Sequence, residues 1–255
     1  ADATDLVLVH TKAPVGFFAY PDKPSVLTAS TTHVSRLAEL EEDALDALEA
    51  LADRLGVGAI EAGAFRSAEP VPARPEGELN PFTLGQAVAA TLPEDTIVVD
   101  EGATGSVFTF PVTAGAPNHD WLSLTGGAIG FGMPSSIGAA VACPGRPVLN
   151  LQADGSAMYT IQSLWTQARE QLDVTTVVFA NRSYGILNAE LDRTGAAPSK
   201  EAEKLFDLSH PELGFTSLAQ GMGVPAERVT EAGALGDALV RAYAEPGPHL
   251  IEAML

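Results

Sequence analysis

The chain has 255 residues and carries 14 basic against 33 acidic residues, which gives a formal net charge of −19 at pH 7. A charge of that sign excludes nucleic acid as a main partner and disfavours binding to an anionic membrane surface, because both need a basic footprint. Hydrophobic residues make up 46% and charged residues 18% of the sequence, which is typical of a globular protein and permits one large domain or two smaller ones.

The sequence also limits location and ligand chemistry. No apolar run reaches the roughly 18 residues that a membrane-spanning helix requires. The start at Ala1 shows no signal peptide and enters an apolar run at once, so we expect a processed chain or a piece of a longer protein. Cys143 is the only cysteine, so no internal disulfide can form, and we expect a cytoplasmic location. The five histidines are scattered, without the short spacing of a Cys/His metal site.

The first 62 residues carry a weak α/β pattern. Residues 5–9 predict a short buried strand, residues 25–28 a second strand, and residues 39–55 repeat apolar side chains at helical spacing. Gly56-Val57-Gly58 follows a helix and not a strand, so it is interpreted as a helix C-cap and not as a dinucleotide fingerprint. We predict a partial α/β domain over residues 1–62.

A change in composition separates this part from the rest. Prolines and charges cluster between Gly63 and Pro81, which predicts a linker over residues 63–80 and a second domain over residues 81–255. Helices and strands then alternate, which predicts parallel βαβ units, and the fold class is a doubly wound, mostly parallel α/β sheet with helices on both faces. The predicted helices are 82–91, 133–142, 157–170, 213–222 and 232–244, and the predicted strands are 96–100, 147–153, 174–180 and 249–252, with a short, partly apolar segment at 122–125.

Three strand ends in the second domain carry unusual residues. They are Asp100 to Gly105, Thr125 to Gly132 and Ala153 to Ser156, which are rich in glycine and polar side chains. Open parallel sheets bind ligands beyond the carboxyl ends of their strands. A helix that starts near Ser156 would present N–H groups that suit a phosphate. We therefore expect a ligand at this edge of the sheet.

Asp154 and Asn181 form a predicted metal site. Asp154 lies where a strand becomes a loop, and Asn181 ends the next strand, one helix and one strand later. Both side chains should therefore come to the same end of two neighbouring strands. Carboxylate and amide oxygens, completed by phosphate oxygens, form the hard donor set that Mg²⁺ prefers. The pattern predicts a divalent cation that binds a diphosphate.

Three motifs make this interpretation specific: Gly126-Gly127-Ala128-Ile129-Gly130-Phe131-Gly132-Met133-Pro134, Ala153-Asp154-Gly155-Ser156-Ala157-Met158-Tyr159 and Ala180-Asn181-Arg182-Ser183-Tyr184-Gly185. Together they resemble the C-terminal cofactor domain of thiamine-diphosphate enzymes, in particular the acetolactate synthase and benzoylformate decarboxylase family. The family motif is Gly-Asp-Gly followed by Asn-Asn. Ala153 and Ala180 depart from it, at positions that supply no metal-ligating side chain in the family. Residues 1–62 resemble the later part of the family's middle domain.

The resemblance implies roles for individual residues. Asp154 and Asn181 resemble the family's Mg²⁺ side-chain ligands, and Ser183 resembles the residue that gives a backbone carbonyl. Gly127 matches the carbonyl that receives the amino group of the aminopyrimidine, and Ile129 matches the aliphatic side chain that bends the cofactor, so these two are the predicted catalytic positions. The other predicted cofactor-binding residues are Glu101, Gly102, Ala103, Thr104, Gly155, Ser156, Tyr159, Tyr184 and Gly185, and the predicted substrate-side residues are Leu187 and Glu190.

The implied reaction is attack of the cofactor ylid on a small 2-oxo acid, followed by loss of CO₂. The family's glutamate for the pyrimidine N1′ lies in a separate N-terminal domain, and nothing before residue 80 resembles that domain. We therefore expect thiamine diphosphate and Mg²⁺ as cofactors, half an active site, and no turnover by this chain alone. A pyrimidine-binding domain from the missing part or from another subunit of a homo- or hetero-oligomer would complete the site. Nothing in this chain supports FAD, which some acetolactate synthases bind in their middle domain.

Alternative functions stay open at this point. An acetolactate-synthase-like enzyme is the leading interpretation. A benzoylformate-decarboxylase-like, non-oxidative 2-oxo acid decarboxylase is the first alternative, because Asn181 to Gly185 lies between the two family patterns. A non-catalytic module that binds the cofactor through the same metal site is the second. A Rossmann dehydrogenase is disfavoured, because no convincing Gly-x-Gly-x-x-Gly with its acidic ribose ligand follows a strand.

Overall fold

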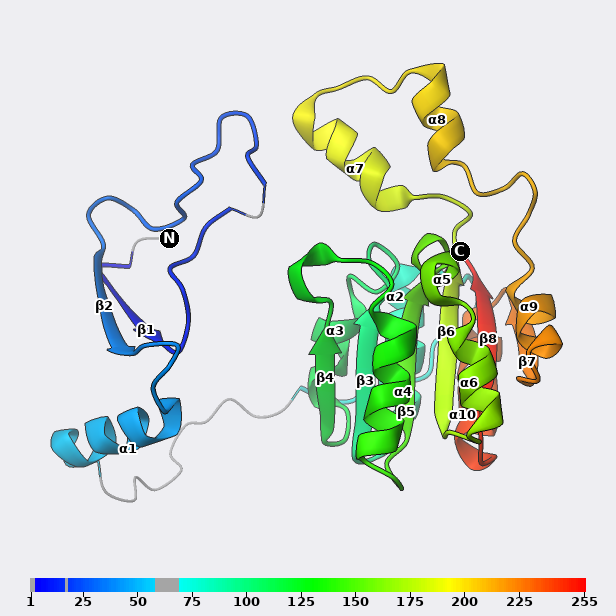
Figure 1. Ribbon diagram of the computed structural model, residues 1–255, viewed down its shortest axis with the longest axis horizontal. Helices are drawn as coiled ribbons and strands as arrows, with labels where there is room; N and C mark the ends of the chain where they lie inside the picture. Colours follow the sequence, from blue (N-terminus) through cyan, green and yellow to red (C-terminus); the bar gives the residue numbers. More distant parts are fainter. Residues whose placement is uncertain (1–2, 17, 58–68) are drawn as a thin grey trace. The chain divides into compact units, whose positions relative to one another are not determined.

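The computed structural model describes residues 3–16, 18–57 and 69–255 (Figure 1). The chain divides into two compact units, a smaller one in residues 3–57 and a larger one that covers nearly all of residues 69–255, and each is described by itself. The last residues of the predicted first domain, from 58 on, and the start of the predicted linker, through residue 68, lie outside the described residues.

The described residues of the smaller unit form two strands and a helix. Strands β1 (Asp5–Val9) and β2 (His33–Ala38) pair in parallel, and α1 (Ala44–Leu55) follows them. Asp43 caps the start of α1 by accepting the N–H groups of Leu45 and Asp46. Gly56 ends it in the left-handed conformation with φ +66°, which confirms the predicted C-cap.

Two expectations for this unit were wrong. The predicted strand at 25–28 is absent, and there Val26 forms only an isolated antiparallel bridge with Val15. The second strand is β2. Ser35 and Arg36 interrupt its apolar residues, so the strand is recognised by its pairing with β1 and not by its sequence pattern. The helix begins at Ala44 and not at residue 39, because the Asp43 side chain takes the first helical N–H groups.

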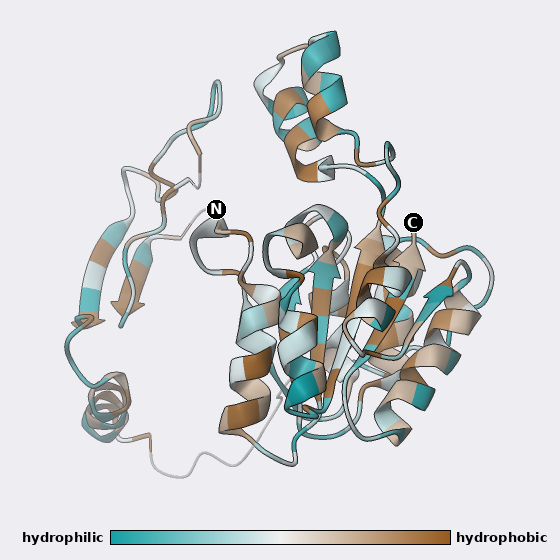
Figure 2. Ribbon diagram, turned by 45° about the vertical axis from the view of Figure 1, so that its right-hand side comes forward, coloured by the Kyte–Doolittle hydropathy of each residue, from teal (hydrophilic) through white to brown (hydrophobic). Residues whose placement is uncertain are grey.

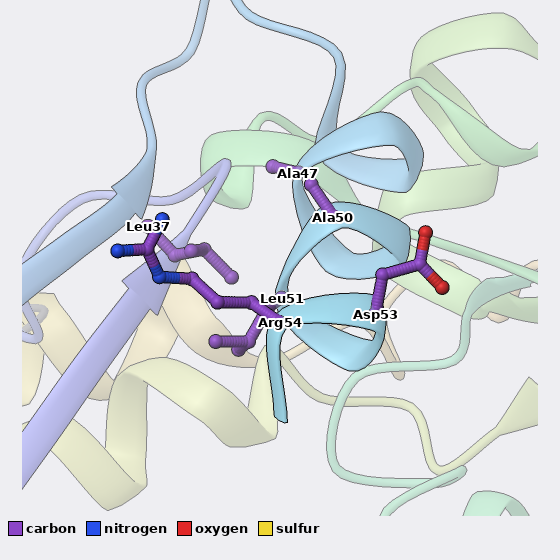
Figure 3. Close-up of a pocket in the computed structure, with 6 residues that line it drawn as sticks. All are labelled: Leu37, Ala47, Ala50, Leu51, Asp53 and Arg54. Carbon is purple, nitrogen blue, oxygen red and sulfur yellow. The ribbon is translucent and has the colours of Figure 1, made fainter. Parts of the chain in front are cut away.

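The smaller unit buries little apolar surface. Leu8 and Ala38 are its buried hydrophobic residues among those described, and no residue of α1 is fully buried. An open hollow of about 700 Å³ lies beside α1 (Figure 3), and its lining residues are Leu37, Ala47, Ala50, Leu51, Asp53 and Arg54. A unit of this size with so small a core is marginal by itself.

The larger unit is built on a six-stranded parallel sheet. Its strand order is β4-β3-β5-β6-β8-β7, and every neighbouring pair is parallel. This confirms the predicted doubly wound α/β fold. The strands are β3 (Thr96–Glu101), β4 (His119–Ser123), β5 (Val148–Ala153), β6 (Val174–Ala180), β7 (Ala226–Val229) and β8 (His249–Met254).

Helices cover both faces of this sheet (Figure 1). Helices α2 and α10 pack together on one face, and α4, α6 and α9 lie on the other. Helices α7 and α8 project beyond the end of the sheet where the strands finish. The helices are α2 (Pro81–Thr91), α3 (Thr109–Val112), α4 (Gly132–Ala142), α5 (Asp154–Thr160), α6 (Ser163–Arg169), α7 (Gly185–Thr194), α8 (Lys200–Phe206), α9 (Phe215–Gly221) and α10 (Ala232–Ala244), with short 3₁₀ turns at Thr113–Gly115 and Thr125–Gly127.

The core of the larger unit lies on both sides of its central strands. On the α2 and α10 face, Leu149, Leu151 and Phe179 pack in one buried cluster. On the other face, Val178 packs with Met133 of α4 and with residues of α6 and α9. Figure 2 shows hydrophobic residues along these strands and mixed hydropathy on α7 and α8. Among the described helices, none is both long enough and apolar enough to cross a bilayer.

The prediction of one continuous helix over residues 157–170 was wrong. Two helices occupy that stretch, α5 and α6, and α5 already starts at Asp154. The break leaves α5 with seven residues. Helices α7 and α8 and the strand β7 were not predicted, because α7 and α8 contain no fully buried residue and β7 is a four-residue edge strand with charges at Glu227 and Arg228. Such segments lack the apolar periodicity that a sequence pattern detects.

Candidate metal and diphosphate site

The predicted ligand-binding loops gather at one edge of the larger sheet. Strands β3, β5 and β6 are neighbours, and their carboxyl ends carry the loops that begin at Glu101, Asp154 and Asn181. The chain passes from β3 outward to β4 and then returns to β5 on the other side of β3. This reversal is the topological switch point at which open α/β sheets bind ligands.

Asp154 and Asn181 are brought together by the pairing of β5 with β6. One oxygen of the Asp154 carboxylate accepts the Gly155 N–H at 2.8 Å, and the other accepts the Arg182 N–H at 2.6 Å, directly after Asn181. The Asn181 side-chain oxygen accepts the Ser183 N–H at 2.9 Å. The Asp154 carboxylate, at the end of β5, therefore contacts the turn that begins at Asn181, at the end of the neighbouring strand β6.

Burial raises the pKa of the Asp154 carboxyl, and the N–H groups of Gly155 and Arg182 oppose that rise only in part. The side chain is 2% exposed, so its charge lacks most of the solvation that water would give. A cation beside it would favour the ionised form. The site is therefore electrostatically prepared for a positive ligand.

Ser183 lies at the base of the projection formed by α7 and α8. It forms an antiparallel bridge with Asp207, in which the Tyr184 N–H donates to the Phe206 carbonyl and the Leu208 N–H donates to the Arg182 carbonyl, both at 2.9 Å. Neither bond uses the Ser183 carbonyl. That oxygen is the one the resemblance assigns to the metal.

Tyr184 packs directly over Gly155. A Cβ at Gly155 would lie 2.3 Å from a ring carbon of Tyr184, so only glycine fits beneath the ring. Burial raises the pKa of the Tyr184 hydroxyl, with smaller contributions from Tyr159 and Asp154, which places those groups near it. The Tyr159 side chain is 59% exposed at this edge.

The loop after β3 reaches the same place. A Cβ at Gly185 would lie 3.3 Å from the Thr104 hydroxyl oxygen and 3.4 Å from the Asn181 side-chain nitrogen, so these three residues converge. Asp100, which the sequence did not single out for a role, shapes the loop by accepting the Gly102 N–H at 2.9 Å.

The backbone of this loop is tightly constrained. Ala103 takes the left-handed conformation with φ +49°, which costs energy for a residue with a side chain. Gly102 and Gly105 both lie against Phe179, where a Cβ would come within 2.4 and 2.5 Å of its ring. The loop of residues 101–105 is therefore held close to the end of β6.

The glycine-rich loop of residues 126–132 forms the other side of the edge. Gly126 and Gly127 have φ +63° and +68° and form part of a 3₁₀ turn. Ile129 stands in this loop with 41% of its surface exposed. The Glu101 side chain does not face this open edge, because its carboxylate accepts the N–H groups of Gly130 and Gly132.

The positions of three predicted site residues support their predicted roles less directly. The Ser156 hydroxyl faces inward, where it accepts from the Gln152 amide at 2.7 Å and lies 3.1 Å from the Ala153 carbonyl, so a phosphate there would meet the backbone and not the hydroxyl. Leu187 and Glu190 lie on α7, which begins directly after Tyr184 and projects beyond the carboxyl end of the sheet (Figure 1).

The donor set at this edge is oxygen alone. Among residues 3–16, 18–57 and 69–255, no group of three or more His, Cys, Asp or Glu side chains could hold a metal ion. The neighbouring loops at Asp154 and Asn181 instead offer one carboxylate, one amide oxygen and one backbone carbonyl, which suits a cation that keeps phosphate or water oxygens as further ligands. These residues fit Mg²⁺ bound to a diphosphate and do not fit a closed zinc site.

The fold and this edge define a cofactor-binding α/β domain of the kind found in thiamine-dependent enzymes. Residues 84–253 match the family model for the C-terminal TPP-binding domain of thiamine pyrophosphate enzymes. The chain belongs to this family.

Relatives support the same assignment. The Mycobacterium tuberculosis protein IlvX, which carries the name of an acetolactate synthase large subunit, is 52% identical over 254 residues, which cover 98% of this chain and 48% of that protein. The benzoylformate decarboxylase of Pseudomonas aeruginosa is 33% identical over 186 residues, which cover 72% of this chain and 34% of that enzyme.

A solved structure has the same fold. The thiamine diphosphate-dependent 4-hydroxybenzoylformate decarboxylase of Rhodococcus jostii RHA1 matches with a TM-score of 0.75 and 24% identity over 97% of this chain and 48% of that chain. The chain spans about half the length of IlvX and of this decarboxylase. The activity of the whole protein is therefore a matter for proposal.

Proposed function

We propose that the chain supplies the Mg²⁺- and thiamine diphosphate-binding half of an enzyme that decarboxylates a small 2-oxo acid and transfers the resulting group, as an acetolactate synthase does. The observation that carries the proposal is the turn in which the Asp154 carboxylate contacts the backbone directly after Asn181. Its oxygen donors lie beside the switch point, at the ends of β5 and β6, in a domain whose family binds this cofactor.

Each loop of the edge has a task in this proposal. Asp154, Asn181 and the Ser183 carbonyl would hold Mg²⁺, and Gly102 to Thr104, Gly155, Ser156 and Tyr159 would surround the diphosphate. Tyr184 and Gly185 would close the metal-bearing turn from the side of α7. The carbonyl of Gly127 would accept a hydrogen bond from the aminopyrimidine, and Ile129, which is partly exposed, would support the bent form of the cofactor.

Bound thiamine diphosphate supplies a thiazolium carbon that adds to the keto group of a 2-oxo acid and a ring that accepts the electron pair left when CO₂ departs. The chain's own residues would bind the cation, which neutralises the diphosphate, and would orient the cofactor. Asp154 contributes the negative charge that holds the cation, and the buried position of that carboxylate keeps water from competing for it. Leu187 and Glu190 on α7 would face the substrate side.

The remaining half of the site would come from elsewhere. We propose that residues 1–62 are part of a middle domain, that residues 63–80 are a linker and that residues 81–255 are the cofactor domain. A pyrimidine-binding domain, from further chain or from another subunit of an oligomer, would complete the site. We also propose a cytoplasmic location, since the single cysteine makes no use of an oxidising compartment.

A benzoylformate-decarboxylase-like activity is the second candidate, and the 33% identity to the Pseudomonas aeruginosa enzyme favours it. The two candidates differ in product. With the pyrimidine-binding domain supplied, carboligation would convert pyruvate to acetolactate, whereas simple decarboxylation would release only an aldehyde.

Calorimetric titration of the 255-residue chain with thiamine diphosphate tests the cofactor assignment. Binding should require Mg²⁺ and should be lost in Asp154→Ala. Binding that is equally tight with excess chelator, or that survives the substitution, would contradict the proposal. A protein that binds the cofactor but releases no CO₂ from any 2-oxo acid after the missing domain is restored would instead be a non-catalytic module.

A further inference from the structure

A buried carboxylate lies beneath the glycine-rich loop. Glu101 is the last residue of β3 and is 2% exposed. Both of its carboxylate oxygens are used, one by the Gly130 N–H and the other by the Gly132 N–H. Removing a carboxylate from water is costly unless strong hydrogen bonds replace the lost solvation, so these two bonds are what allows the charge to lie here.

The same loop is confined from its other side. A Cβ at Gly132 would lie 2.4 Å from the Gln152 side-chain oxygen, 2.9 Å from a Glu101 carboxylate oxygen and 3.0 Å from the Asn150 side-chain oxygen. Three polar side chains from β3 and β5 therefore converge on one backbone position, the first residue of α4. Only glycine can occupy that position while both N–H groups reach the carboxylate.

We infer that Glu101 is a positioning residue that fixes the glycine-rich loop 126–132 through its side chain while its backbone continues into the loop of residues 102–105. This part of the inference depends on the contacts alone. Its consequence for ligands depends on the proposed function, in which Gly127 and Ile129 support the pyrimidine half of the cofactor and the loop after β3 lies by its diphosphate. Glu101 then sets the relative placement of the two loops.

A carboxylate is required by the number of donors. Each of the two N–H groups meets a different carboxylate oxygen, and an amide in the same place would offer one oxygen and one NH₂ group that faces a donor. Loss of one hydrogen bond to a charged group shifts an equilibrium by about ten- to a hundredfold. Glu101→Gln should therefore release the loop while leaving the sheet intact.

Amide hydrogen exchange tests the fixation without any ligand. In Glu101→Gln the amides of Gly130 and Gly132 should exchange about tenfold faster or more, with amides of β5 and β6 unchanged. The matched control is Glu170→Gln, at the exposed end of α6, which should change neither set. Unchanged exchange at Gly130 and Gly132, or equal acceleration throughout the larger unit, would overturn the inference. If Glu101→Gln does not fold, the same exchange measurement is made on Glu101→Asp, whose shorter side chain cannot reach both N–H groups. The same results would support or overturn the inference.

Ligand affinity tests the consequence. Glu101→Gln should weaken binding of Mg²⁺–thiamine diphosphate about tenfold or more, whereas binding of Mg²⁺ with inorganic diphosphate should stay within about twofold of the wild type. A purely structural role would weaken both ligands equally, and that result would overturn the positioning role. Failure of the wild type to bind thiamine diphosphate would overturn the proposed function, and the exchange experiment would still decide whether Glu101 fixes the loop.

Discussion

Replacing Asp154 with asparagine separates the stability of the larger unit from its response to ligands. Without ligands the change in the free energy of unfolding should be small, because two effects oppose each other. Asparagine removes a buried charge, which stabilises the fold, but it also replaces one of the two acceptor oxygens used by Gly155 and Arg182, which destabilises it. With Mg²⁺ and thiamine diphosphate the difference in stability between the wild type and the variant should be large. The wild type at a ligand concentration of a hundred times Kd should gain about 2.7 kcal/mol, which raises Tm by about 5–10 °C for a unit of this size.

The variant should lose nearly all of that gain. A hundredfold loss of affinity, which lies within the range for removing one partner of a charge pair, leaves about 0.4 kcal/mol, or a Tm increase of about 1 °C. Scanning calorimetry with and without both ligands measures the two increases. Asp173→Asn is the control for the loss of a carboxylate, because Asp173 is exposed and immediately precedes β6, at the opposite end of that strand from Asn181. An increase of equal size in Asp154→Asn and wild type would refute the reasoning.

Three further substitutions test the packing and the buried polar groups of the larger unit. Gly102→Ala should lower the stability by about 1–3 kcal/mol in chemical denaturation, because its Cβ would lie 2.4 Å from the Phe179 ring, and an unchanged midpoint would contradict that close approach. Thr176→Val should raise the stability by about 1 kcal/mol, because the fully buried Thr176 hydroxyl has no hydrogen-bond partner among the described residues, and a destabilised variant would show that the hydroxyl is satisfied. Burial tends to raise the pKa of Glu252, but hydrogen bonds from the Thr216 side chain and from Arg228 outweigh it and hold the pKa below its ordinary value of 4.5. The stability due to this lowered pKa should therefore be present above pH 4.5 and lost as the pH falls below it, and unfolding curves of Glu252→Gln should lack that part of the acid sensitivity.

The parallel sheet could be predicted because its central strands are continuous apolar runs between helical patterns. Residues 174–180 have strong β-branched character and form β6 with the predicted bounds, and residues 232–244 form α10 with theirs. The closeness of Asp154 and Asn181 follows from the same alternation, since consecutive parallel strands that pair bring their carboxyl ends to one edge.

Features that depend on tertiary contacts could not be predicted from the sequence. The resemblance placed Glu101 in a loop over the phosphates, but it could not indicate that the side chain turns inward to two N–H groups supplied by residues 130 and 132. The inward hydroxyl of Ser156 depends in the same way on Gln152. Helices α7 and α8 contain no fully buried residue, and a helix that packs little against a core need not carry the continuous apolar stripe that distinguishes a helix from a loop in a sequence.

The small unit shows a different limit. Strand β2 is defined by its parallel pairing with β1, whereas its own residues alternate weakly. Strand propensity depends on neighbouring strands and burial more than on the segment itself. A segment such as 25–28 can therefore look like a strand and yet form only the single bridge at Val26.

The account depends on one cation held between Asp154 and Asn181. Anomalous X-ray diffraction from crystals of the chain grown with Mn²⁺ and thiamine diphosphate tests this most directly, because Mn²⁺ accepts the oxygen ligands that suit Mg²⁺. The account predicts one manganese peak bound by the side-chain oxygens of Asp154 and Asn181 and by the Ser183 carbonyl, at distances of about 2.0–2.2 Å. A bound cofactor whose diphosphate has no metal at these residues, or a manganese peak elsewhere in the larger unit, would contradict it.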